Sequence, residues 1–227
     1  MSEQTNVESM QLGLTVIGNL YADLGTSEAF RANVKALQSS DYPLSYTQVN
    51  LGHVDLHDET IAIHQDSQFP INYFHLNAPE FLEYALPQLG KKFFKNHYNI
   101  GYWVIERDDF IPDSWLPAIS LLDEIWTASN FTKEIIEKST DIPVKVVPHP
   151  IDIKPDLSIT RQYFGLPKDT FLFLFAFDPR STSARKNPLG LIQSFKDAFP
   201  VSNNAPTLVI KTYGLSKFPN LRKAMHT

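Results

Sequence analysis

The chain has 227 residues, and 43% of them are hydrophobic, so it is long enough for one large domain, or one and a half smaller ones, with a packed core. A formal net charge of -5 argues against a protein that binds nucleic acid by broad neutralisation of phosphates. Cysteine is absent, which excludes disulfides, a thiolate nucleophile and cysteine-ligated zinc.

The beginning of the sequence gives no signal for export. Residues 1–11 are polar and lack the apolar segment of a signal peptide, and no uninterrupted apolar run is long enough to span a bilayer. The lack of cysteine is typical of a reducing compartment. We therefore expect a cytoplasmic protein whose membrane contact is at most peripheral, at the inner face of the membrane.

Short apolar runs alternate with runs of helical periodicity along the whole chain. The strand candidates are apolar on both faces, as in parallel strands that helices cover on both sides. They are residues 14–17, 44–49, 71–76, 99–105, 124–128, 144–147, 171–177 and 207–211. This order of strands and helices predicts a doubly wound α/β architecture.

The helix candidates have apolar residues three or four positions apart. The first carries Phe30, Val34 and Leu37, and the second carries Phe81, Ala85 and Leu89. In the third, residues 130–139, we expect Phe131, Ile135 and Ile136 to point inward. In the fourth, Asn187 can cap the first turn and Pro188 fits the first helical position. Its predicted inward stripe is Leu189, Ile192, Phe195 and Phe199.

The turn after the first strand carries a glycine, Gly25, where the chain enters a helix. Thr26 or Ser27 can cap this helix, and its exposed amide groups could face an anionic ligand. A glycine at such a turn can also be present only because it suits the backbone geometry of the turn, so a phosphate site and a structural turn are both open interpretations.

Residues 52–59 contain His53, Asp55, His57 and Glu59 at alternate positions, which would place them on one face of an extended run. A metal site and a hydrated polar loop are both compatible with this pattern. No orienting partners can be identified for the histidines, and the acidic pairs at 108–109 and 123–124 suit helix N-termini, so we expect no metal site.

A domain boundary is predicted at residues 148–156, because the prolines there can extend neither a central strand nor a helix. We predict an N-terminal α/β domain over 1–153 and the start of a second domain over 154–227. The second part holds only two strands and one complete helix, which bury too little to stand alone, so we expect it to be incomplete.

Residues 177–188 join the most apolar strand to the best-capped helix and hold Asp178, Arg180, Arg185 and Lys186. Three cations and a helix N-terminus thus converge on the carboxyl end of a strand, where α/β sheets bind ligands. A solvated basic loop is the alternative. No Ser, His and Asp set has the spacing of a nucleophile elbow, so hydrolase chemistry lacks support.

The sequence resembles the group 1 glycosyltransferases, the retaining GT-B enzymes of glycosyltransferase family four. The resemblance lies in the order and spacing of blocks at residues 13–31, 73–81, 99–115, 121–132, 144–152 and 171–199. It implies two Rossmann-like domains that face each other across a cleft, with the acceptor mainly on the first and a nucleotide-diphosphate sugar on the second. It implies no cofactor.

The resemblance also implies roles for individual residues. Similar enzymes hold the donor diphosphate with the basic pair at Arg185 and Lys186, and their glycine turn at the position of Gly25 approaches the donor phosphates. Relatives place a functional histidine near the end of the strand at 73–76. Asn77 occupies that position here and His75 lies two residues earlier, so these two are the candidate catalytic residues.

The function implied is transfer of a sugar from a nucleotide-diphosphate carrier to a glycan or lipid-linked acceptor, with retention, as in polysaccharide biosynthesis. The family segment with paired glutamates that grip the donor lies beyond residue 227, so we expect the chain as given to be inactive. The alternative is a non-catalytic glycan- or nucleotide-binding module. The sequence specifies neither the donor nor the acceptor.

Overall fold

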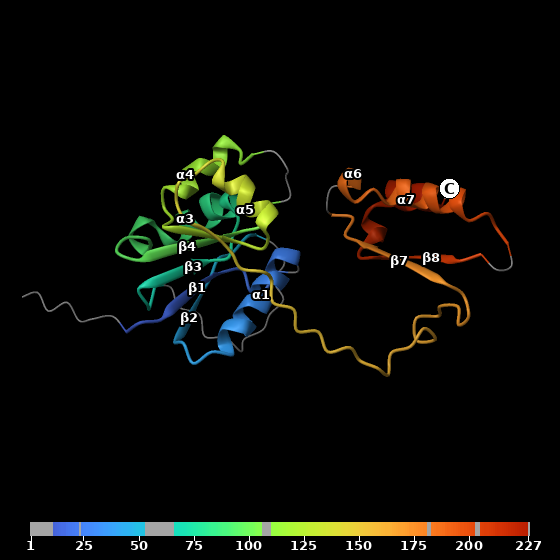
Figure 1. The fold of residues 1–227 in the computed structure, drawn as a ribbon, viewed down its shortest axis with the longest axis horizontal. Coiled ribbons are helices and arrows are strands. Elements are labelled where there is room, and N and C mark those ends of the chain that lie inside the picture. Colours follow the sequence, from blue (N-terminus) through green and yellow to red (C-terminus); the bar gives the residue numbers. More distant parts are fainter. Residues whose placement is uncertain are drawn as a thin grey trace, which may run out of the picture. The chain divides into compact units, whose positions relative to one another are not determined.

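The computed structural model describes residues 11–22, 24–52, 66–105, 110–180, 183–202 and 205–226. The chain divides into two compact units, residues 1–153 and 154–227 (Figure 1). Within the described residues, no helix combines the length and the apolar character needed to cross a bilayer.

The first unit is built on a six-stranded sheet in the order β2-β1-β3-β4-β5-β6, and every pairing in it is parallel. The predicted α/β class is therefore confirmed, and the fold is Rossmann-like. Each predicted strand segment of this unit contains a strand: β1 (Leu14–Gly18), β2 (Leu44–Gln48), β3 (Ile71–Phe74), β4 (Tyr98–Trp103), β5 (Glu124–Thr127) and β6 (Val144–Val146).

Helices cover both faces of this sheet. Alternate residues of each strand point to opposite sides, so each face contributes its own set of buried side chains. Helix α1 (Gly25–Gln38) packs Phe30 and Val34 on one face, with Val16 of β1. The other face packs Ile17 against a continuous helical segment made of α2 (Ala78–Glu80), a π-helical turn, η1 (Phe81–Ala85), and α3 (Leu86–Leu89). Also on that face are α4 (Leu116–Ile119) and α5 (Asn130–Glu137). Ile135 and Ile136 of α5 are buried as predicted, but the inward prediction is wrong for Phe131, which is 56% exposed. The 3-10 turns are η2 (Lys91–Phe93) and η3 (Asp113–Trp115).

The π-helical turn was not predicted, and a proline explains it. Pro87 has no amide hydrogen, and its ring would clash with the carbonyl group four residues earlier in a regular helix. The turn widens just before it, so that the amide of Leu86 donates to the carbonyl of Phe81, five residues back.

The second unit contains a parallel pair, β7 (Leu172–Phe177) and β8 (Thr207–Thr212). Its helices are α6 (Ser183–Lys186), α7 (Pro188–Ala198), the 3-10 turn η4 (Leu215–Lys217) and α8 (Pro219–His226). The predicted cap of α7 is confirmed: Asn187 has φ of 47° and its side-chain oxygen accepts a hydrogen bond from the amide of Gly190.

The predicted inward stripe of α7 is correct for Phe195 and Phe199, whose rings pack against Phe173 at centroid distances of 5.7 and 5.3 Å. The prediction is wrong for Leu189, which is 43% exposed, because the two described strands offer no surface that covers the first turn of α7. Leu174 of β7 is likewise 73% exposed, so this small sheet buries its apolar side chains only in part.

A chain of buried polar side chains joins the neighbouring strands β1, β3 and β4. Asn72, which is fully buried, donates to the side-chain oxygen of Asn99 at 3.0 Å and to the carbonyl of Phe93 at 3.2 Å. It also accepts a hydrogen bond from Ser67, which lies 3.2 Å from the hydroxyl of Thr15. Since each of these groups is satisfied only in one register, the network fixes how the strands pair.

We predict that Asn72→Ala lowers the free energy of unfolding of the first unit by about 2–3 kcal/mol, because it leaves buried hydrogen-bonding groups without partners. Urea unfolding followed by tryptophan fluorescence measures this selectively, since all three tryptophans lie at positions 103, 115 and 126, in the first unit. Asn130→Ala, on the exposed start of α5, is the matched control. Equal stability of the two variants would contradict a structural role for the network.

Candidate functional site

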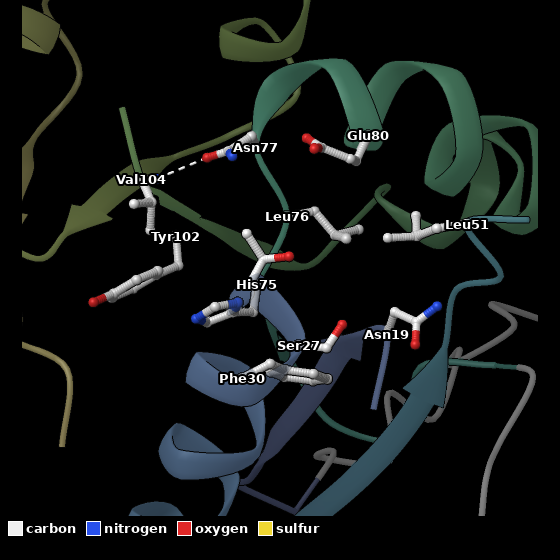
Figure 2. Close-up of a pocket in the computed structure, with 11 residues that line it drawn as sticks. Asn19, Ser27, Phe30, Leu51, His75, Leu76, Asn77, Glu80, Tyr102 and Val104 are labelled. Atoms are coloured by element: carbon white, nitrogen blue, oxygen red, sulfur yellow. Dashed lines mark hydrogen bonds between the residues drawn. The ribbon is translucent and has the colours of Figure 1, made fainter. Parts of the chain in front are cut away.

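A pocket opens at the carboxyl edge of the six-stranded sheet, where the strand order reverses between β1 and β3. In doubly wound sheets this reversal is where ligands bind, because the connections leaving the two strands diverge. Figure 2 shows side chains from α1, from the ends of β1, β3 and β4, and from the start of α2 around it. The lining consists of Asn19, Thr26, Ser27, Phe30, Leu51, His75, Leu76, Asn77, Glu80, Tyr102 and Val104.

His75 follows β3 and is 5% exposed, with its ring stacked between Phe30 and Tyr102 at centroid distances of 5.2 and 4.6 Å. The Asn33 amide nitrogen lies 3.3 Å from Nε2 of His75 and donates to it, which leaves the ring proton on Nδ1. Burial, aided by the nearby His149, lowers the pKa of His75 to about 3. At neutral pH this histidine is therefore an uncharged, fixed ring in the pocket wall.

The second predicted catalytic residue, Asn77, lies in the same pocket. It precedes α2 but does not cap that helix with its side chain. Its Oδ1 instead accepts a hydrogen bond of 2.7 Å from the amide of Val104, just after β4 (Figure 2). Asn77 therefore ties the ends of two neighbouring strands together at the pocket rim.

Two lining residues that the sequence did not suggest each carry a polar atom without a partner. Asn19 is 3% exposed, and its Oδ1 accepts hydrogen bonds from the amides of Tyr21 and Ala22 at 3.0 and 2.7 Å. Its Nδ2 is buried and has no partner among the described residues, and the same holds for Oε2 of Glu80. Burial raises the pKa of Glu80. The sequence offered two signals for these residues. Asn19 is of a type that forms turns, and Glu80 is an acidic residue in the first turn of a helix.

The predicted phosphate turn at Gly25 adjoins this pocket. Helix α1 has no side-chain cap, and its residues Thr26 and Ser27 line the pocket. Gly25 does not have a positive φ, and a Cβ built on it would meet no described residue within 4 Å. The described residues therefore place no steric demand for glycine at this position.

The other predicted donor-binding residues lie in the second unit, after β7. Asp178 and Arg180 pair with each other: the guanidinium donates to both carboxylate oxygens, and its NH2 group lies 2.7 Å from Oδ2. This hydrogen bonding lowers the pKa of Asp178, and the guanidinium also lies 5.5 Å from the ring centre of Tyr213. Arg185 is exposed and Lys186 half-buried, both at the end of α6.

The candidate metal set at His53, Asp55, His57 and Glu59 lies outside the described residues, as does the acidic pair at 108–109. In the part of the chain that the structure describes, no group of three or more His, Cys, Asp or Glu side chains is placed to hold a metal ion.

Comparison with known proteins does not assign a family. No protein-family model matches the chain, and no curated protein matches it. The family resemblance read from the sequence blocks thus stays a prediction, whereas the α/β class rests on the parallel sheet itself.

We predict that His75 makes the protein less stable as the pH falls. The folded-state pKa of about 3 lies below the ordinary value of 6.5, so the unfolded chain binds a proton between these values and the folded chain does not. In that window the residue costs up to about 1.4 kcal/mol of stability per pH unit. Urea unfolding of wild type and of His75→Gln at a series of pH values from 7 to 4 measures this, because that range covers most of the interval between the two pKa values. Parallel stability profiles for the two proteins would contradict the buried neutral state.

Proposed function

We propose that this chain belongs to a glycosyltransferase of the retaining GT-B type, an enzyme that transfers a sugar from a nucleotide-diphosphate donor to a hydroxyl of a glycan or lipid-linked acceptor. The first unit would supply the acceptor side, and the second would supply the cations for the donor diphosphate. The ordered sequence blocks, the Rossmann-like sheet and the position of the pocket at its strand reversal support this proposal.

The observation that carries the proposal is the turn between β1 and α1. Here a helix of 14 residues begins without a side-chain cap, and its first turn lines the pocket. The helix starts at a glycine that neither its φ nor the described residues around it require. An anion held by the exposed amides would require a residue without a side chain at this position. A phosphate of the donor meets that description.

The basic loop after β7 supplies the second part of the proposed chemistry. As the bond between the sugar carbon and the diphosphate breaks, negative charge builds on the leaving group. Lys186 and Arg185 follow the carboxyl end of β7 and precede the capped helix α7, so they are the cations we assign to this charge. Arg180 is assigned to shaping the loop through its pair with Asp178.

The uncharged side chains of His75 and Asn77 in the pocket wall suit a role in positioning the reacting groups. His75 is uncharged at physiological pH because burial lowers its pKa to about 3, so it suits fixed packing and hydrogen bonding more than proton transfer. Asn77 holds the rim between β3 and β4. Both would then orient the reacting groups, and the leaving-group charge would be stabilised by the cations.

We predict that the protein binds nucleoside diphosphates more tightly than the matching monophosphates, and that Lys186→Ala weakens diphosphate binding roughly tenfold, the scale of one charge-assisted contact. Calorimetric titration with UDP, GDP and ADP measures this. Lys196→Ala, on the exposed surface of α7, removes the same charge elsewhere and should leave binding unchanged. If no nucleoside diphosphate binds, or if both variants bind like wild type, the proposed function is wrong.

We also predict that Gly25→Ala leaves the stability of the first unit unchanged or raises it by up to about 1 kcal/mol, since alanine is the better helix former and has room here. Diphosphate binding should nevertheless weaken, because the added methyl group occupies the space next to the amides of α1. Tryptophan-monitored unfolding and the same titrations measure the two effects. Unchanged binding would show that Gly25 is a plain backbone turn.

A further inference from the structure

The two units of the chain carry opposite net charges, which the total of -5 conceals. Residues 154–227 hold eleven lysines and arginines against four aspartates and glutamates, whereas residues 1–153 hold nine against twenty-one. An excess of positive charge attracts anionic ligands and raises the rate at which they associate. The distribution of charge therefore favours the second unit as the part that takes up an anionic ligand.

Several of these cations lie beyond the carboxyl ends of the two strands of the second unit. Arg180, Arg185 and Lys186 follow β7, and Lys217 follows β8. Because β7 and β8 are parallel, their carboxyl ends meet at the same edge of the sheet. The carboxylate of Asp178 at this edge is paired with Arg180. The edge is thus basic, and it is the edge at which α/β sheets bind ligands.

An exposed aromatic ring, that of Tyr213, lies at the same edge. Tyr213 directly follows β8, and the last pair in the register is Phe177 with Thr212, so the segments after the two strands leave the sheet side by side. Tyr213 is 64% exposed, and the guanidinium of Arg180 lies 5.5 Å from its ring centre. Gly214 has φ of 65°, which turns the chain immediately after the tyrosine. The ring is therefore held against the basic loop and stays open to solvent.

The other exposed aromatic side chains that the structure describes in the second unit lie away from these cations. Tyr163 and Phe164 pack edge to face on each other ahead of β7. Phe171 and Phe173 lie at the amino-terminal end of β7, the opposite end from the basic loop. Of the described rings in this unit, Tyr213 is the one that combines exposure with a position beside the cations.

A nucleoside diphosphate has two chemical parts, a charged diphosphate and a flat aromatic base. Bases stack on exposed aromatic side chains, and a neighbouring guanidinium adds a cation–π contact. We propose that Tyr213, flanked by Arg180, is the surface on which the base of a nucleoside diphosphate stacks. The inference rests on the proposed function and deepens it, because it gives the base of the donor a binding residue of its own.

A comparison of ligands with and without a base tests this assignment. Calorimetric titration is made with UDP, GDP and ADP and with inorganic pyrophosphate, which offers the charge alone. We expect Tyr213→Leu to weaken binding of the preferred nucleoside diphosphate roughly tenfold, the scale of one stacking contact, and to leave pyrophosphate binding unchanged. Tyr213→Phe keeps the ring and should bind like wild type.

The matched control is Tyr163→Leu, which removes an exposed ring of the same unit away from the cations and should leave binding of both kinds of ligand unchanged. Amide spectra of each variant verify that the second unit keeps its fold. Tyr213→Leu that binds nucleoside diphosphates like wild type would overturn the inference. Equal weakening of nucleoside diphosphate and pyrophosphate would also overturn it, since the ring would then only hold Arg180 and the basic loop in place.

A single-stranded oligonucleotide is the other ligand with both bases and phosphates. If it binds through Tyr213 more tightly than any nucleoside diphosphate, the edge is a nucleic-acid surface and the inference is wrong. If wild type binds no nucleoside diphosphate, the proposed function fails and this inference fails with it. If wild type binds one and Tyr213→Leu binds it equally well, only this inference fails, so the two failures are distinguishable.

Discussion

The strand order of the parallel sheet is the constraint on which the site of this protein depends. From β1 the chain crosses to β2 on one side, and the later strands continue from β3 on the other. Because crossovers between parallel strands are right-handed, α1 and the helical segment after β3 lie on opposite faces. The carboxyl ends of β1 and β3 therefore adjoin while the chains that leave them diverge, and the pocket occupies the space between.

That crevice combines the first turn of α1 with buried side chains, among them a neutral histidine and a neutral asparagine. Burial keeps His75 neutral and raises the pKa of Glu80, and the amide of Asn19 is neutral at all times. The cations assigned to the donor diphosphate, Arg185 and Lys186, lie in the second unit. A diphosphate needs cations that remain near water, and Arg185 and Lys186 at the end of α6 meet that requirement in the proposal.

The sequence predicted the fold well because apolar runs and helix caps are local signals. The strand segments and the Asn187 cap could be located from neighbouring residues alone, whereas the outward Leu189 and the π-turn before Pro87 depend on what surrounds each helix. The site was only partly predictable. His75 and Asn77 came from a family resemblance, but Asn19 and Glu80 are distinguished by hydrogen bonds that they do not make among the described residues, and no sequence pattern encodes that.

Amide chemical-shift mapping with a nucleotide sugar tests most directly whether the strand reversal is the binding site. The account predicts that the shifts concentrate at the ends of β1 and β3, in the first turns of α1 and α2, and in the loop between β7 and α7, where Asn19, Gly25, Asn77, Glu80 and Lys186 lie. Shifts confined to the amino-terminal edge of the sheet or to the outer surfaces of α4 and α5, with these segments unperturbed, would contradict it.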